Sequence, residues 1–120
     1  MQLGDKSSIT RSFSADDLAA FHRQAGIQDS AIGSVPEPLI GALFSYLLGV
    51  ELPGFGTNYL KQEMQFLHPA PIGLPLTASV EITRLRPDKH LVDLRTVCAG
   101  PDGKIYCEGR ALVLAKDVGK

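Results

Sequence analysis

The sequence predicts an α+β fold, in which helices come early in the chain and antiparallel strands follow. Two observations indicate this class. Apolar residues recur at helical spacing between residues 35 and 50, and beyond residue 56 they alternate with a period of two. With 120 residues, of which 44% are hydrophobic and 21% charged, the composition is that of a globular protein. We therefore expect one domain spanning 1–120.

The first elements follow from local signals. Residues 8–13 are expected to form a short strand, after which Ser14 begins a helix. Asp17 stands three positions after Ser14, the spacing of a capping box, in which each side chain accepts a hydrogen bond from the other residue's backbone N–H. The helix is expected to end at Gly26. Residues 27–34 lack periodicity and are expected to form a loop.

The second helix is the most informative element. Ser34 is placed to cap its N-terminus, and Glu37 completes the Ser-x-x-Glu spacing of a capping box. No charged residue follows between Pro38 and Val50, and large apolar residues repeat every four positions: Leu39, Leu43, Leu47 and Ile40, Phe44, Leu48. A helix this apolar has to be covered on most sides, so we expect it in the core.

The rest of the chain alternates and is broken by turns. Residues 57–68, 75–86, 90–99 and 104–115 are expected to be four successive antiparallel strands. The turns are rich in Pro, Gly and Asp, as tight connections require. One long buried helix with a strongly curved sheet wrapped around it satisfies the burial demand best. This arrangement is the hotdog fold.

The two cysteines are too few for a disulfide scaffold, and their spacing matches no zinc pattern. If Asp102 and Gly103 form a two-residue hairpin loop, Cys98 lies directly opposite Cys107 on the neighbouring strand. Packing alone explains such a cross-strand pair.

The net charge of −1 gives no general attraction to nucleic acid or to an anionic membrane, and neither is expected as a partner. No apolar run is long enough to span a bilayer, and no secretory signal opens the chain, so a cytoplasmic location is expected. The glycines of Gly54-x-Gly56 lie between a helix and a strand. This order is the reverse of a dinucleotide-binding motif and indicates a turn.

Four stretches together resemble the MaoC-like (R)-specific enoyl-CoA hydratases and 3-hydroxyacyl dehydratases. Phe13–Phe21 matches the start of the family's first helix, Val35–Gly49 its central helix, Leu52–Leu60 the following loop and strand, and Phe66–Gly73 the next strand end with its Pro-x-x-x-Gly turn. The resemblance implies a hotdog domain that binds an acyl-CoA or acyl-carrier-protein thioester. CoA or phosphopantetheine would be part of the substrate, with no separate cofactor.

The chain departs from the family at the catalytic motif. The family carries Asp-x-Asn-Pro-x-His after its first helix, whereas the corresponding segment here is only Gly26 to Ser34 and contains no histidine. The three histidines are elsewhere: His22, His68 and His90. His68, which precedes Pro69 at a strand end, is expected to be structural. Asp29 is the remaining acidic residue near the position of the motif.

The resemblance still marks candidate site residues. Asp29 and Glu37 are the candidate catalytic groups, and Glu37 stands where the family has a glycine whose amide holds the thioester carbonyl. Glu37 also has a structural interpretation as a helix cap. Ser45, Gly56 and Tyr59 are the candidate acyl-binding residues, although Ser45 and Tyr59 also suit ordinary packing. Among the cations, three are candidates for contacts with CoA phosphates or are simply scattered on the surface: Lys61, Arg84 and Arg86.

Three functions remain open from the sequence, and with them whether the chain is an enzyme at all. The domain would hydrate or dehydrate an acyl thioester with substitute groups, or hydrolyse the thioester with Glu37 or Asp29. Alternatively, it would serve as the non-catalytic partner of an active hydratase. In each case the open edges of a single curved sheet favour a homodimer or a heterodimer with another hotdog protein.

Overall fold

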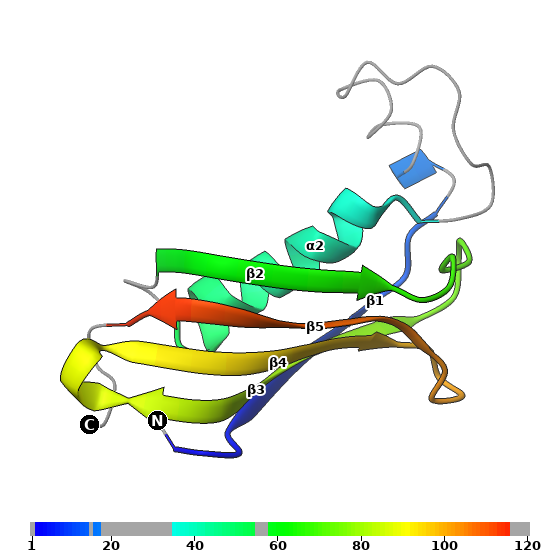
Figure 1. Ribbon diagram of the computed structural model, residues 1–120. Coiled ribbons are helices and arrows are strands. Elements are labelled where there is room, and N and C mark those ends of the chain that lie inside the picture. The colour runs from blue at the N-terminus through cyan, green and yellow to red at the C-terminus, as the bar shows by residue number, and fades with distance from the viewer. Residues whose placement is uncertain (1, 15, 18–34, 55–57, 116–120) are drawn as a thin grey trace.

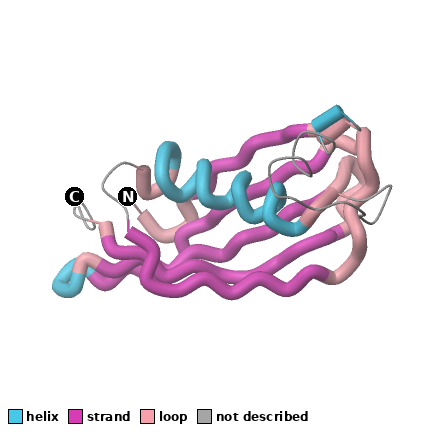
Figure 2. The backbone as a smooth tube through the Cα atoms, turned by 90° about the horizontal axis from the view of Figure 1, so that it is seen from above, coloured by secondary structure: helices cyan, strands magenta, loops and turns pink. Residues whose placement is uncertain are grey.

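The structure is a computed structural model that describes residues 2–14, 16–17, 35–54 and 58–115. The long helix of the described residues, α2 (Glu37–Tyr46), lies along one face of a five-stranded antiparallel sheet (Figures 1 and 2). The strands are β1 (Lys6–Arg11), β2 (Asn58–Phe66), β3 (Leu76–Arg86), β4 (Leu91–Ala99) and β5 (Ile105–Leu114). This arrangement confirms the predicted α+β hotdog fold.

The spatial order of the strands is β1-β3-β4-β5-β2. β3, β4 and β5 are joined in sequence by short turns, while β1 and β2 occupy the two edges. β2 therefore pairs only with β5, the last strand of the chain, with Asn58 opposite Leu114 and Phe66 opposite Cys107. Within the described residues, no helix has both the length and the apolar character needed to cross a bilayer.

The N-terminal strand is shifted from its predicted place. β1 was expected over 8–13 but runs from Lys6 to Arg11, because its only neighbour is β3 and the pairing ends where β3 begins, at Arg11 opposite Leu76. Phe13 lies beyond the strand and is buried.

The capping box that follows β1 is confirmed. The Ser14 backbone N–H donates to the Asp17 carboxylate at 2.8 Å, and the Asp17 N–H donates to Ser14 Oγ at 3.1 Å. The backbone N–H of Ser14, and after it the Ser14 side chain, hold the pKa of Asp17 below its usual value. The predicted end of this helix and the loop at 27–34 lie outside the described residues.

The core helix begins later than predicted. Its N-cap is Pro36, so Glu37 is the first helical residue and not the third, as the predicted capping box required. Ser34 lies outside the described residues. Pro38, the second residue of the helix, has no N–H that needs a cap, and the Leu39 N–H donates to the Pro36 carbonyl at 3.0 Å. After Tyr46 the helix continues as a π-helical turn, Leu47–Glu51. Its buried face packs into the core through Ile40, Leu43, Phe44, Leu47 and Leu48.

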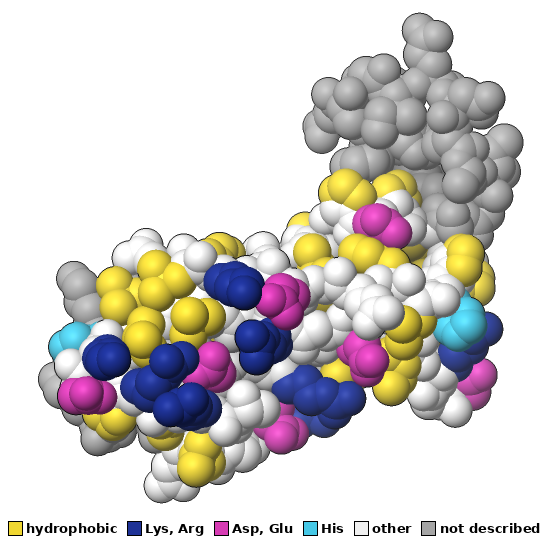
Figure 3. Space-filling view, viewed as in Figure 1, with side chains coloured by type: hydrophobic (Ala, Val, Ile, Leu, Met, Phe, Trp, Pro, Cys, Tyr) yellow, Lys and Arg dark blue, Asp and Glu magenta, His cyan; other side chains and the backbone are white. Residues whose placement is uncertain are grey.

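The two faces of the sheet differ in character. On β3, Leu76, Ala78, Val80 and Ile82 are fully or almost fully buried on the helix side, while the residues between them are only half buried. Alternation of this kind places one side of each strand in the core and the other on the outer face. The outer face is the one turned toward the viewer in Figures 1 and 3.

Cys98 and Cys107 face each other as predicted, although the turn between them is different. The Gly100 N–H donates to the Lys104 carbonyl at 2.9 Å, which makes a three-residue loop, with Gly103 at φ 85°, instead of the predicted two-residue loop. A bulge then shifts the register between Cys98 and Ala99 and restores the Cys98–Cys107 pair.

Both cysteines are fully buried and unpaired, and burial raises the pKa of each thiol to about 11. Because the thiolate is the reactive form, we expect neither to react with Ellman's reagent in the folded protein at pH 8. In denaturant both should react fully, which a colorimetric thiol count measures. Rapid stoichiometric labelling of the folded protein would contradict this expectation.

Candidate functional site

A pocket of about 370 Å³ lies between the start of α2 and the segment that follows the end of β2. Its apolar lining includes Val35, Ile40 and Ala70, which are at most 5% exposed, and the half-buried Phe66. The remaining lining residues are more exposed: Pro36, Glu37, Leu67, His68 and Pro69. The pocket therefore combines an apolar floor with a polar rim, which is typical of small-molecule sites.

Backbone hydrogen bonds fix the two segments that form this pocket. The Val35 N–H donates to the Ala70 carbonyl at 2.7 Å, which ties the approach to α2 to the segment after β2. The Leu67 N–H donates to the Tyr106 carbonyl at 2.8 Å and holds the same segment against β5. The positions of the rim residues are thus set by main-chain contacts from two directions.

Glu37 and His68 are the two titratable residues among those that line the pocket. A carboxylate accepts a proton from water, and an imidazole both accepts and donates protons near neutral pH. Glu37 is also the first residue of α2, where backbone N–H groups and the helix dipole favour a developing negative charge. The pocket accordingly offers a base, an acid and an electropositive helix end.

The negative charge of Glu37 affects the pKa of a buried thiol near the pocket, that of Cys107. Burial is the main cause of the raised pKa of Cys107, and the negative charges of Glu37 and Glu108 add to it. Cys107 lies opposite Phe66, which lines the pocket, so the carboxylate and the thiol are close to the same site. Among the described residues, no three His, Cys, Asp or Glu side chains converge as metal ligands would.

The predicted site residues that the structure describes do not converge on one place. Of the three described candidates, Glu37, Ser45 and Tyr59, only Glu37 lines the pocket. Ser45 is exposed on the third turn of α2, and Tyr59 lies 44% exposed at the start of β2, at the far end of that strand from the pocket. Asp29 and Gly56 lie outside the described residues, so their predicted roles are untested.

His68 was expected to be structural, but it is exposed and lines the same pocket as Glu37. His68 precedes Pro69 directly after a strand, and the residue before a proline is held in an extended conformation. This local restriction does not show where the segment lies in the fold. Its position at the start of α2 follows from the hydrogen bond between Val35 and Ala70, which are far apart in the sequence.

Comparisons with known proteins agree with this fold. The chain is 33% identical over 129 aligned residues to the (R)-specific enoyl-CoA hydratase of Aeromonas caviae, with 94% of each chain covered. It is 41% identical over 76 residues to the (R)-specific enoyl-CoA hydratase of Rhodospirillum rubrum, covering 63% of this chain and 52% of that protein. No family model matches the chain.

Solved structures give the same result. The (R)-hydratase from A. caviae, described as involved in PHA biosynthesis, superposes with a TM-score of 0.87 at 32% identity, covering 96% of this chain and 97% of that one. The R-hydratase PhaJ1 from Pseudomonas aeruginosa gives 0.86 at 28% identity, with 96% and 82% covered. The fold and site define a hotdog domain with an apolar pocket at the start of its helix. The chain belongs to the MaoC-like (R)-specific enoyl-CoA hydratase family, as the sequence resemblance predicted.

Proposed function

We propose that this domain binds an acyl-CoA or acyl-carrier-protein thioester in the pocket at the start of α2 and catalyses (R)-specific hydration of its enoyl group, or the reverse dehydration. The observation that carries the proposal is the presence of Glu37 and His68 on one apolar pocket in a member of this family. The pantetheine-bearing carrier is part of the substrate, so the reaction requires no separate cofactor.

Hydration adds a hydroxyl group to C3 of the enoyl chain and a proton to C2. The Glu37 carboxylate takes one proton from water, and the oxygen of that water forms a bond to C3. The electrons of the C2–C3 double bond shift toward the thioester carbonyl, and the protonated imidazole of His68 donates a proton to C2. A proton then passes from Glu37 to His68, so that one water is consumed and both side chains return to their starting states.

The positive end of α2 contributes to the same step. Negative charge develops on the thioester oxygen as C3 is attacked, and the backbone N–H of Glu37 heads the helix at the pocket. Asp29 remains a candidate for an additional carboxylate. Ser45, Gly56 and Tyr59 remain candidates for contacts with the acyl chain.

The test is turnover of crotonyl-CoA by the purified full chain, followed as loss of the conjugated enoyl absorbance, with chiral analysis of the 3-hydroxybutyryl-CoA formed. Release of free CoA thiol is measured in parallel, because it would indicate the thioesterase alternative. Saturable hydration with the (R) product supports the proposal. Saturable binding without any turnover would contradict the catalytic part and favour a non-catalytic partner subunit.

The edge of the sheet supports assembly with a second hotdog chain. Among the described strands β2 pairs with β5 alone, so its other side has no strand partner in this part of the chain. Partly exposed apolar side chains lie on or just after β2, namely Tyr59, Leu60, Met64 and Leu67. Two more lie at the end of the helix, Tyr46 and Val50. A second copy joined antiparallel at β2 about Gln62 would bring Lys61 of each chain opposite Glu63 of the other. We therefore favour a homodimer over a heterodimer.

Introducing a charge into this edge is expected to produce monomers. Leu60 is 55% exposed on β2, and Leu60→Lys would place a charge on the edge where the second chain joins. Size-exclusion chromatography with light scattering should show a dimer for the unmodified chain and a monomer for the variant. Leu3→Lys, at a residue 65% exposed ahead of β1, is the control and should remain dimeric. An unmodified chain that is monomeric by itself would contradict the homodimer.

A further inference from the structure

A second hollow, of about 270 Å³, lies on the outer face of the sheet, away from α2. We call it the outer groove. It is lined by side chains from four neighbouring strands: Lys61, Glu63, Arg84, Arg86, Asp93, Arg110, Ala111 and Leu112. Figure 3 shows Lys and Arg side chains gathered on this face, at the end where β2 begins. Cations that are scattered along the sequence thus come together in space.

The outer groove holds four cationic side chains and two carboxylates, so it carries an excess of positive charge. Glu63 is held by Lys61 at 3.0 Å and by Arg110 at 3.5 Å, and these contacts lower the pKa of Glu63. Both contacts are at an exposed surface, where such pairs are weak and exchange readily with solvent or another anion. The carboxylates therefore organise the cations but do not neutralise them.

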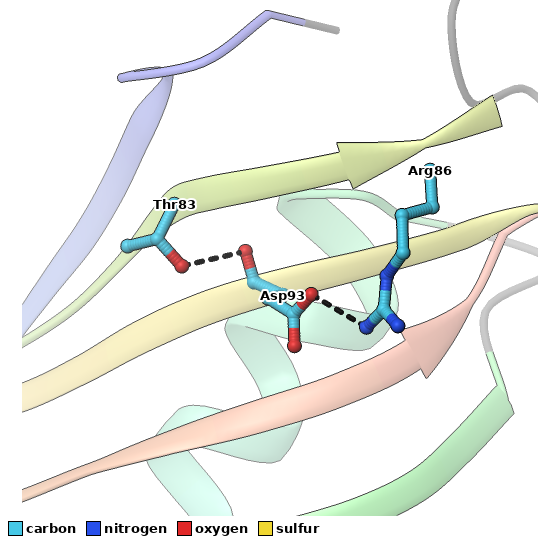
Figure 4. Close-up of polar contacts among 3 residues, drawn as sticks. All are labelled: Thr83, Arg86 and Asp93. Carbon is cyan, nitrogen blue, oxygen red and sulfur yellow. Dashed lines mark hydrogen bonds and ion pairs between the residues drawn. The ribbon is translucent and has the colours of Figure 1, made fainter.

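Arg86 is fixed firmly in this groove. Its Nη2 donates to the Asp93 carboxylate at 2.7 Å, and Figure 4 shows it reaching from β3 across β4. The Thr83 hydroxyl donates to the backbone carbonyl of Asp93 at 3.2 Å and steadies the same strand pair. Arg86 Nε is buried and has no hydrogen-bond partner among the described residues. The contact with Asp93 therefore fixes the planar guanidinium group of Arg86 beside the other cations of the groove.

Two other arginines have donors that no described residue engages in an ion pair. Arg84 makes no ion pair with any residue that the structure describes, and the ion pair of Arg110 with Glu63 is made by its Nε at 3.5 Å, on an exposed side chain. Their planar guanidinium groups match the geometry of phosphate oxygens, which accept two parallel hydrogen bonds. Carboxylate ligands are matched as well, but phosphate carries the larger charge that an excess of cations favours.

We propose that the outer groove binds a phosphate or pyrophosphate group, with Arg84, Arg110 and Lys61 as its ligands and Arg86 as the fixed residue beside them. The site lies on the opposite face of the sheet from the pocket at α2, and it does not depend on the proposed hydratase activity. Two sources supply this chemistry, the nucleotide end of CoA and free inorganic phosphate.

The test uses the full chain, titrated with inorganic phosphate, pyrophosphate, ADP and CoA in separate NMR experiments at constant ionic strength. Saturable shifts of the β2, β3 and β5 amides around the groove are expected. Arg84→Gln and Arg110→Gln should each weaken binding about tenfold, because each removes a charge-assisted hydrogen bond. Saturation by inorganic phosphate identifies a free-anion site, whereas saturation by ADP and CoA alone identifies a site for nucleotide phosphates.

Arg95→Gln is the matched control. Arg95 lies on the same face, outside the groove, and pairs with Glu108 at 3.6 Å. Its replacement changes the net charge by the same amount and should leave binding unchanged. Equal weakening in all three variants would overturn the proposal, because it would show a diffuse charge effect. Absence of saturable shifts with all four probes would overturn it as well.

Discussion

Replacing Glu37 by Gln is expected to lower kcat for crotonyl-CoA hydration about 100-fold or more, because a positioned general base contributes at least this factor. The amide keeps the size and the polar contacts of the side chain but cannot accept a proton from water. KM should change little, since the floor of the pocket is made by other residues. His68→Asn is expected to give a loss of the same order by removing the proton donor.

The matched controls lie away from the pocket. Glu51→Gln alters an exposed carboxylate at the far end of the helix, and His90→Asn alters an exposed histidine at the turn after β3. Asparagine tolerates the left-handed conformation of His90, so the turn should be retained. Both variants should keep full activity. Unchanged kcat in Glu37→Gln would exclude Glu37 as the base, and loss of CoA release in that variant would indicate a thioesterase instead.

Gly109→Ala is expected to reduce the free energy of unfolding by about 3 kcal/mol or more, near the upper end of the cost of overpacking. A Cβ at Gly109 would overlap the backbone carbonyl of Glu63 and lie 3.0 Å from the Met64 Cα. These are main-chain atoms of β2, so a change of side-chain rotamer cannot relieve the clash. Relief requires β2 to move away from β5, which would weaken the ladder. Urea unfolding of both proteins measures the difference.

Gly49→Ala provides the comparison for this stability effect. A Cβ at Gly49, in the π-helical turn after α2, meets no atom within 4 Å. Alanine loses less backbone entropy than glycine on becoming helical, so this variant should be unchanged or more stable by up to about 1 kcal/mol. Equal destabilisation by the two substitutions would contradict the assignment of the Gly109 effect to the close approach of β2.

The fold was predictable because the residues that one face of a helix or strand buries recur at a regular spacing in the sequence. The four-residue repeats through Phe44 predicted a core helix, and the alternation after residue 56 predicted four strands that the structure contains within about two residues of their expected ends. The start of α2 was not predicted, because a backbone hydrogen bond from Leu39 to Pro36 begins the helix two residues after the polar cap that the pattern suggested. The pairing of β2 with β5 could not be predicted either, because it joins segments that are far apart in the sequence and no local pattern indicates it.

The candidate site was harder to predict for the same reason. Glu37 was found because it stands at a position that the family resemblance marks. His68 was missed because its significance depends on the approach of the segment after β2 to the start of α2, which no spacing in the sequence encodes. Likewise, Lys61 and Arg84 are far apart in the sequence, and only the sheet order brings them into one groove.

The placement of β1 and β2 at the edges has a consequence for the order in which the chain folds. β3, β4 and β5 are connected by tight turns, so their hairpins close at little entropic cost. By contrast, the β2–β5 ladder pairs residues at least as distant in sequence as Phe66 and Cys107, and the β1–β3 ladder at least as distant as Arg11 and Leu76. The central three strands should therefore acquire protection from hydrogen exchange first. The pocket at α2, which needs the end of β2, would be completed only after β2 has joined β5.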